Sequence, residues 1–343
     1  MILDMIEITI FTVCVTFSVA YTTVAERKTL GYTQRRTGPN AVGYYGTTQA
    51  FADAVKTTIK EIITPKESNK YITVMSPTIT TITATIGWVV IPTGPAITTG
   101  DMENGITFST AIGSTGVFGV TTSGWSSNSK YSFMGSIRST AQTISYETVT
   151  TTIYIICIMF VSTTNITTYI ETQRIVWTFI PTFPTFIIFF ISTVAETNRP
   201  PFDTVEAESE TVAGFFTEYS GSPFVFFFTA EYSNTITMCA STTITFTGGY
   251  TNISVTNDIF TFPTNGIQYS TPYNTAEGAT YGIATAIKLI MTMFTFIWVR
   301  ASFPRFTYDN TINTCWTVFT PTTFGFTTFV PCVTYVFNAF SYV

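Results

Sequence analysis

The chain has 343 residues, of which 45% are hydrophobic, 16% aromatic and only 10% charged, with a net charge of −5. Soluble domains carry about 25% charged residues, so this composition excludes an ordinary water-exposed surface and indicates a membrane protein. The chain contains no His and five Cys without paired spacing, which excludes His-ligated haem, common zinc sites, Cys-held iron–sulfur clusters and His-dependent nucleophilic catalysis.

Eight segments with few charged residues follow one another along the chain. Each is close to the roughly 20 residues that a membrane-spanning helix needs, when Thr is counted as neutral because its hydroxyl can bond back to a helix carbonyl. They cover residues 7–24, 71–95, 106–125, 137–163, 175–197, 219–247, 276–299 and 312–337. None shows the alternation typical of strands, so the sequence predicts an all-α polytopic membrane protein with a single membrane domain over residues 1–343.

The long first loop contains another kind of helix. Residues 47–63 place Phe51, Val55, Ile59 and Ile62 at spacings of three and four, with most charged residues elsewhere on the helical wheel. This pattern predicts an amphipathic helix that lies at the membrane interface. A surface helix packed against the rest of the protein gives the same pattern and is the alternative.

The basic residues test the order of the eight segments. If every segment spans the membrane, the first, third, fifth and seventh loops share one face; they cover about residues 25–70, 126–137, 198–218 and 300–311. These loops and their edges carry 13 of the 15 Lys and Arg residues, all except Arg174 and Lys288. The positive-inside rule predicts such a bias when the order of spans is correct.

The ionisable residues inside the segments include Glu147, Glu231, Glu277 and Lys288. A charged group at membrane depth is costly and is therefore a functional candidate. A structural ion pair, or a position at the edge of a segment, is the alternative for each. Several carboxylates in one bundle favour a proton route, because buried carboxyl groups can load and release protons.

An acidic segment lies between the fifth and sixth spans, on the face where basic residues otherwise prevail. It contains the single Arg199 and six acids, Glu196, Asp203, Glu206, Glu208, Glu210 and Glu218. A solvated acidic loop is the simplest interpretation, but apolar residues such as Val205 and Phe215 are interleaved with the acids, and a solvated loop does not need them. Repulsion among close acids couples their protonation, so we expect them to respond together to a nearby charge.

Short motifs occur in order along the chain: Ala25-Glu26-Arg27-Lys28, Gln34-Arg35-Arg36-Thr37-Gly38-Pro39-Asn40, Phe51-Ala52-Asp53-Ala54, Ser123-Gly124-Trp125, Gln142-Thr143-Ile144-Ser145-Tyr146-Glu147, Ala195-Glu196-Thr197-Asn198-Arg199-Pro200-Pro201-Phe202-Asp203, Ala230-Glu231-Tyr232 and Arg300-Ala301-Ser302-Phe303-Pro304-Arg305. Together they resemble the family of chain 1 of NADH:ubiquinone oxidoreductase, respiratory complex I, over essentially the whole chain. The first apolar run follows acids rather than Lys or Arg, which is not typical of a transit peptide and agrees with a product encoded in fungal mitochondria.

The resemblance implies a subunit of a proton-pumping enzyme in the mitochondrial inner membrane, placed where the membrane arm meets the hydrophilic arm. The subunit would form most of the tunnel by which ubiquinone enters from the bilayer, and it would carry no redox centre of its own. Electrons would come from NADH through FMN and iron–sulfur clusters in partner subunits. The implied partners are the quinone-reducing hydrophilic-arm subunits, the antiporter-like membrane subunits and lipids, with no nucleic acid.

Carried over by position, the resemblance assigns two groups of residues and no catalytic or metal-binding residue. The quinone-binding group is Arg27, Arg36, Phe51, Ala52, Asp53, Phe224, Phe228, Arg300 and Arg305. The proton-relay group is Glu147, Glu196, Asp203, Glu206, Glu208, Glu210, Glu218 and Glu231. The expected mechanism is that quinone reduction changes the charge in the cavity and the acids pass this change to the antiporter-like subunits. A stand-alone ion or proton transporter and a purely structural arm-joining subunit are the alternatives.

The chain contains 73 Thr and only three Leu. Thr stands where the resembling family usually has Leu, as at Thr47, Thr48, Thr57 and Thr58, whereas motif residues other than Leu are intact. A difference in codon reading explains this pattern. Either the ribosome that makes the chain reads CUN codons as Thr, so that the chain carries Thr at these positions, or it reads them as Leu. Apolar burial is worth about 0.8 kcal/mol per methylene, which favours Leu. For this reason we base no functional assignment on a Thr hydroxyl.

Overall fold

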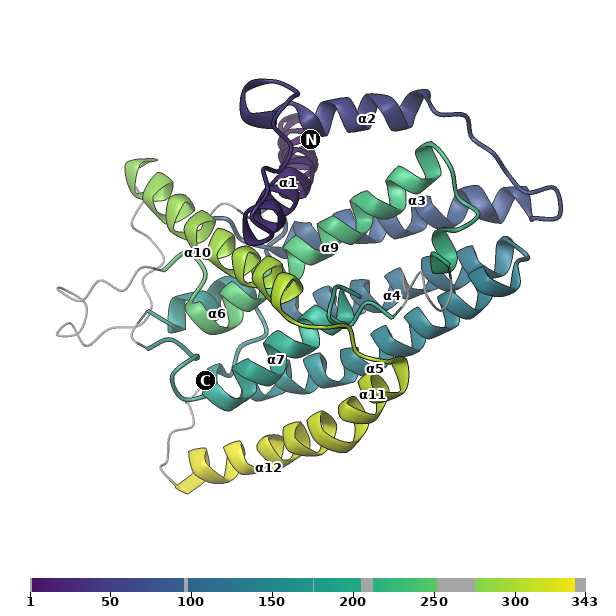
Figure 1. Ribbon diagram of the computed structural model, residues 1–343. Helices are drawn as coiled ribbons and strands as arrows, with labels where there is room; N and C mark the ends of the chain where they lie inside the picture. Colours follow the sequence, from purple (N-terminus) through teal and green to yellow (C-terminus); the bar gives the residue numbers. More distant parts are fainter. Residues whose placement is uncertain (1, 96–97, 175, 205–211, 252–274, 337–343) are drawn as a thin grey trace.

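A computed structural model describes residues 2–95, 98–174, 176–204, 212–251 and 275–336, and these ranges are helical without an extended strand (Figure 1). The helices are α1 (Ile2–Thr33), α2 (Gln49–Ile59), α3 (Lys70–Ile86), α4 (Gly105–Ser126), α5 (Lys130–Val161), α6 (Ile166–Thr172), α7 (Phe183–Glu196), α9 (Ser222–Thr247), α10 (Thr275–Ser302), α11 (Tyr308–Thr314) and α12 (Thr320–Val336). Short 3-10 turns cover Tyr44–Gly46, Gly87–Val90 and Gly214–Phe216, and a π-helical turn, Cys315–Phe319, joins α11 to α12. The predicted all-α class is confirmed.

Two long helices organise the packing. α5 packs against α4, α7 and α12, while α9 packs against α3, α1 and α10. Figure 1 shows α12 along the lower side of this arrangement and α2 at its upper edge, near one end of α1. Fully buried side chains, among them Tyr146, Ile153, Phe189 and Phe246, belong to one apolar core to which α5, α7 and α9 all contribute.

Each of the eight predicted segments contains a long helix or most of one. Among the residues that the structure describes, four helical stretches are long and apolar enough to cross a membrane: Ile8–Thr33, Lys70–Val90, Lys130–Val161 and Thr280–Ser302. The chain is therefore a polytopic membrane protein by length and composition. The number of eight spans stays a prediction, because α7, for example, has only 14 residues against the roughly 20 that a span needs.

Some helix boundaries differ from the predicted ones for physical reasons. α1 continues past residue 24 to Thr33 and α5 begins at Lys130 rather than at residue 137. Charged residues mark the edge of the apolar region, but they do not end a helix. A long cationic side chain can extend from within the apolar region to the membrane surface. α7 begins later than residue 175 because Pro184 fits only in the first turn of a helix.

The helix predicted in the first loop exists as α2 and ends before residue 63. Its Phe51, Val55 and Ile59 side chains are exposed, Ile59 by 78%, so most of its apolar face is not packed against the described part of the chain. This exposure agrees with an interfacial helix, and the membrane placement itself stays a prediction.

Lys288 has a structural explanation. Its Nζ donates hydrogen bonds to the carbonyl oxygens of Thr247 (2.7 Å), Gly249 (2.8 Å) and Thr251 (2.6 Å) at the C-terminal end of α9. A cation at a helix C-terminus satisfies unpaired carbonyls and complements the helix dipole. The side chain of Glu277, the other charge predicted in that segment, lies outside the described residues.

Candidate functional site

A buried carboxylate on α1 is the first part of the site. Glu26 is only 6% exposed and shares a helix face with Val15, Val19 and Thr22, which precede it at spacings of three and four. This face is directed toward α9 and α10, which both contact α1. Burial of a carboxylate costs several kcal/mol unless partners compensate it, so the surroundings of Glu26 must supply charge and hydrogen bonds.

Three side chains supply these partners. Arg199 Nη1 lies 3.2 Å from Glu26 Oε1, and Arg300 Nη1 forms an ion pair with the same oxygen. The hydroxyl of Tyr232 donates a hydrogen bond of 2.6 Å to Glu26 Oε2. Both carboxylate oxygens are therefore bound, by groups from α9, from α10 and from the segment that follows α7.

Arg199 links Glu26 to a second acid. Its Nε lies 3.0 Å from Glu231 Oε1 on α9, and its guanidinium lies over the Tyr232 ring, 4.1 Å from the centroid. Burial lowers the pKa of Arg199, but the Glu231 and Glu26 carboxylates outweigh this and hold it above its ordinary value, so the guanidinium stays charged. We refer to Glu26, Arg199, Glu231, Tyr232 and Arg300 as the Arg199 cluster.

A second ion pair connects the same segment to the residues after α10. Arg305 Nη2 lies 2.7 Å from Asp203 Oδ2, and the Asp203 side chain is 8% exposed. The backbone N–H of Phe306 donates to the carbonyl of Pro201 (3.0 Å), and the rings of Phe202 and Phe306 lie 5.4 Å apart. The segment with Arg199 and Asp203 is thus held against the α10–α11 connection.

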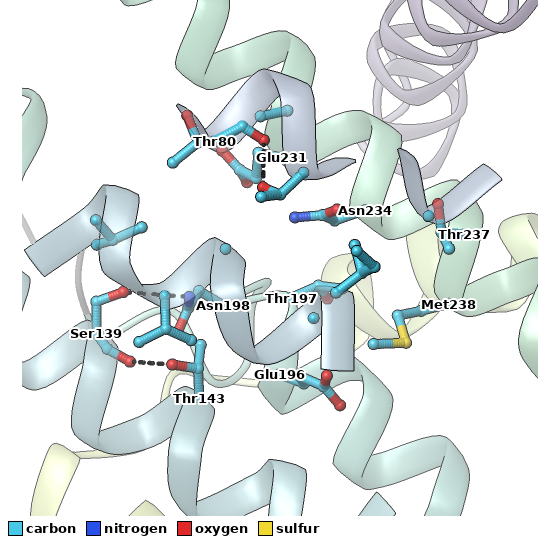
Figure 2. Close-up of a pocket in the computed structure, with 18 of the residues that line it drawn as sticks. Thr80, Ser139, Thr143, Glu196, Thr197, Asn198, Glu231, Asn234, Thr237 and Met238 are labelled. Atoms are coloured by element: carbon cyan, nitrogen blue, oxygen red, sulfur yellow. Dashed lines mark hydrogen bonds between the residues drawn. The ribbon is translucent and has the colours of Figure 1, made fainter. Parts of the chain in front are cut away.

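A cavity of about 170 Å³ lies beside the Arg199 cluster. Three predicted relay residues line it, Glu147 from α5, Glu196 from α7 and Glu231 from α9, and Figure 2 shows Glu196 and Glu231 among the lining side chains. Glu147 accepts a hydrogen bond from the Ser114 hydroxyl, whereas Glu196 Oε2 is buried without a hydrogen-bond partner in the described structure. A cavity of this size with carboxyl groups in its lining can hold several water molecules. We refer to it as the acid cavity; Glu231 belongs to both the cavity and the cluster.

An aromatic row on α9 leads to the Arg199 cluster. Phe224, Phe228 and Tyr232 follow at intervals of four, with ring centroids 4.5 Å and 6.5 Å apart. Phe216, from the turn before α9, packs against Phe224 and Phe228 at 5.9 Å and 5.6 Å. Phe224 and Phe228, both predicted quinone-binding residues, therefore form a half-buried apolar surface that ends at the charged Arg199 cluster.

The remaining predicted quinone-binding residues lie at the α1–α2 corner. Arg27 Nη1 pairs with Asp53 Oδ2 at 2.5 Å, and the ring of Phe51 lies edge-on to Phe17 at 6.0 Å. Ala52 is exposed beside Asp53. Arg36 is also exposed, and its Nε donates to Gln34 of its own loop (2.8 Å). The structure thus brings together Arg27, Phe51, Ala52 and Asp53 and leaves Arg36 apart from them.

The predicted relay residues fall into three groups. Glu147, Glu196 and Glu231 meet at the acid cavity, while Asp203 pairs with Arg305. Glu218 is half-buried before α9 and does not line this cavity in the part of the chain that the structure describes. Glu206, Glu208 and Glu210 lie outside the described residues.

The residue-level prediction did not assign a role to Glu26, Arg199 or Tyr232. Two signals in the sequence could have found them. Glu26 continues the helical spacing of buried Val15 and Val19, and Arg199 is the single cation among six acids. A lone cation within an acidic segment is typical of a shared ion-pair partner.

Comparison with known proteins covers this entire region. A family model described as NADH dehydrogenase matches residues 6–331. The chain is 62% identical over 340 residues to NADH-ubiquinone oxidoreductase chain 1 of Yarrowia lipolytica, covering 99% of both chains, and 48% identical over 334 residues to that of Candida albicans, covering 97% of this chain and 96% of the other. An NADH-quinone oxidoreductase subunit of Rhodospirillum centenum is 43% identical over 304 residues, covering 89% of this chain and 85% of the other. The matched region includes every residue of the Arg199 cluster and of the acid cavity.

Proposed function

The chain belongs to the NADH dehydrogenase family, and from this premise we propose that it is the chain 1 type of membrane subunit of an NADH:ubiquinone oxidoreductase in the mitochondrial inner membrane. It takes part in quinone reduction as a subunit of the enzyme, and FMN and iron–sulfur clusters in partner subunits deliver the electrons. High identity to a chain 1 protein over nearly the whole length supports this assignment.

The subunit provides the access path for ubiquinone. The aromatic row Phe224, Phe228 and Tyr232 offers an apolar lane for an isoprenoid chain, and the lane ends at the Arg199 cluster, which offers hydrogen-bonding and charged groups to a polar head group. The α1–α2 corner, with Arg27 and Asp53, borders the entrance, together with the predicted Arg36, Phe51 and Ala52. Arg300 and Arg305 hold the α10–α11 connection, which faces the hydrophilic-arm subunits that reduce the quinone.

The subunit also couples quinone reduction to proton movement. Reduction of the quinone takes up protons and changes the charge near Glu26. Because Arg199 is shared between Glu26 and Glu231, a change at Glu26 alters the charge balance at Glu231, and Glu231 lines the acid cavity with Glu147 and Glu196. Closely spaced acids titrate as a coupled group, so the acid cavity passes the change toward the antiporter-like subunits. Asp203, Glu206, Glu208, Glu210 and Glu218 extend the relay.

The observation that carries this proposal is the double role of Glu231. It pairs with Arg199 on one side and lines the acid cavity on the other. A Glu231→Gln variant keeps the size of the side chain and removes its charge. In the assembled complex we expect it to lower the number of protons translocated per NADH oxidised, measured in reconstituted vesicles. An unchanged proton-to-NADH ratio would contradict the relay.

A quinone analogue that carries a photoreactive group tests the access path. We expect it to label peptides from the α1–α2 corner and from α9, with excess ubiquinone as the competitor. Labelling confined to other subunits would leave the chain with the structural role of joining the two arms. Purification of the chain without other subunits of the complex would instead support a stand-alone transporter.

A further inference from the structure

Gln142 is a buried amide in the middle of the long helix α5, and it is 0% exposed. Its Nε2 donates two hydrogen bonds of 2.8 Å, one to the carbonyl oxygen of Ala195 and one to that of Phe202. The Oε1 atom accepts a hydrogen bond from the hydroxyl of Thr204 (2.7 Å). The two bonds from Nε2 do not depend on this third bond. Both donors of one side chain thus bind the backbone of one segment.

The segment that Gln142 holds carries three of the charges in the candidate site. Glu196 directly follows Ala195, Asp203 directly follows Phe202, and Arg199 lies between the two anchored carbonyls. Pro200 and Pro201 lie between them as well and have no backbone N–H to donate. The segment has backbone hydrogen bonds of its own, such as those from Asn198 N–H to the carbonyl of Ala195 and from Thr204 N–H to the carbonyl of Phe202, and the Gln142 amide adds a link from the same two carbonyls to α5.

The charges on this segment have narrow positional requirements. Arg199 must reach Glu26 and Glu231 at the same time, at 3.2 Å and 3.0 Å. Asp203 must reach Arg305 at 2.7 Å. Ion pairs inside a protein weaken as their distance increases and leave buried charges uncompensated. A shift of the segment by one ångström would therefore alter both pairs together.

We propose that Gln142 is a positioning residue for the Arg199 cluster and the acid cavity. By binding both carbonyls, it fixes Glu196, Arg199 and Asp203 relative to α5, which carries Glu147 of the acid cavity. It does not contact the quinone or carry protons itself. This inference rests on the proposed function, because it assigns to Gln142 the geometry on which the relay between the cluster and the cavity depends.

The chain offers a matched control for this assignment. Gln173 is also buried, with an exposure of 1%, and its Nε2 donates a hydrogen bond of 2.9 Å to the carbonyl of Ile244 near the C-terminal end of α9. It lines neither the acid cavity nor the Arg199 cluster within the described ranges. Replacing either Gln by Met removes the amide and keeps a similar side-chain volume.

The experiment compares Gln142→Met and Gln173→Met in the assembled complex. Turnover is divided by the rate of electron transfer from NADH to an artificial acceptor, which takes electrons from the complex before they reach the quinone. This second rate measures the amount of assembled complex. We expect Gln142→Met to lower the kcat of ubiquinone reduction roughly ten- to a hundredfold, the range that an ångström-scale misplacement can cause, with a smaller change in KM. Gln173→Met should leave the kcat per assembled complex unchanged. Equal effects of the two variants would overturn the proposal, because they would show a general packing role.

A structure of the Gln142→Met complex separates this inference from the relay proposal. We expect the Arg199–Glu26 distance to increase, and an unchanged distance would overturn the positioning role even if turnover fell. A displaced Arg199 with unchanged kcat would overturn the importance of that position for the reaction. If the relay alone is wrong, Gln142→Met still displaces Arg199 and lowers the kcat, while Glu231→Gln leaves the proton-to-NADH ratio unchanged. If Gln142→Met fails to assemble, Gln142→Asn, which keeps the amide on a shorter side chain, provides the same comparison.

Discussion

Glu26 and Glu196 are both buried acids on helices of one bundle, yet their surroundings differ. Glu26 has two guanidinium partners and a tyrosine hydroxyl. Glu196 lines the acid cavity, where one of its oxygens lacks a hydrogen-bond partner and no ion pair to it occurs among the described residues. The first arrangement fixes a charge and holds three parts of the chain together. The second places an acid next to a space for water, where a proton can be gained or lost without breaking an ion pair.

The comparison assigns different consequences to mutations in the two places. Removing a cation from the Arg199 cluster leaves buried charges without partners, which damages folding and assembly. Removing Glu196 from the acid cavity removes a charge that has no cation partner among the described residues, so we expect it to affect proton movement more than stability.

The strongest test is Arg199→Met. It leaves Glu26 with only one cation and Glu231 with none, and breaking a buried ion pair in this way costs about 3–5 kcal/mol. We expect little assembled complex on native gels. The double variant Arg199→Met with Glu231→Gln removes one of the stranded charges and should recover part of the assembly. Normal assembly of the single variant would show that the cluster does not hold the fold.

Glu196→Gln tests the acid cavity. Because no ion pair is lost, we expect normal assembly and a heat stability equal to or above that of the native complex. Proton translocation coupled to ubiquinone reduction should fall by about a hundred- to ten-thousandfold, the range typical of a lost proton-transfer group. The measurements are thermal unfolding and the rate of vesicle acidification. A large loss of assembly with normal pumping in the remainder would reverse the distinction between the cluster and the cavity.

Arg27→Gln tests an exposed ion pair on α1, next to the buried Glu26. Arg27 and Asp53 form an ion pair with side chains 54% and 37% exposed, and exposed pairs contribute at most about 1 kcal/mol. We therefore expect almost normal heat stability, whereas Glu26→Gln, one residue earlier, should lower it more. Quinone affinity, measured as KM, is the property that Arg27→Gln should change if the α1–α2 corner borders the entrance.

The smallest effect concerns the Thr positions. We expect the masses of peptides covering residues 47–60 to match Leu at Thr47, Thr48, Thr57 and Thr58. Thr80 and Thr83 line the acid cavity, and Leu at these positions would narrow it without moving the acids that define it. Peptide masses that match Thr would show instead that the chain is more polar than its relatives at these positions.

The helices could be predicted from the sequence because each depends on a local property. Apolar segments of about 20 residues indicated the long helices, and the spacing of Phe51, Val55 and Ile59 indicated α2. The ends were less predictable, since α1 and α5 extend beyond the apolar region and α7 begins only where Pro184 allows. The helical class is thus encoded locally, while helix length depends on what lies at the membrane edge.

The candidate site was predictable in its parts but not in its connections. Glu147, Glu196 and Glu231 stand out as acids in apolar segments, and the structure brings them to one cavity. The pairing of Arg199 with both Glu26 and Glu231 could not be predicted, because it depends on how α1 and α9 pack. The role of Gln142 could not be predicted either, since a neutral amide in a long helix gives no signal until its backbone partners are known.

The Arg199 cluster has a consequence for how the protein is made. Glu26 enters the membrane with the first helix, but its partners Arg199 and Arg300 lie 173 and 274 residues later in the chain. A partly synthesised chain therefore carries an uncompensated acid at the edge of the membrane, where such a charge is costly. Glu26 therefore gains its full set of partners only after residues up to Arg300 have been synthesised.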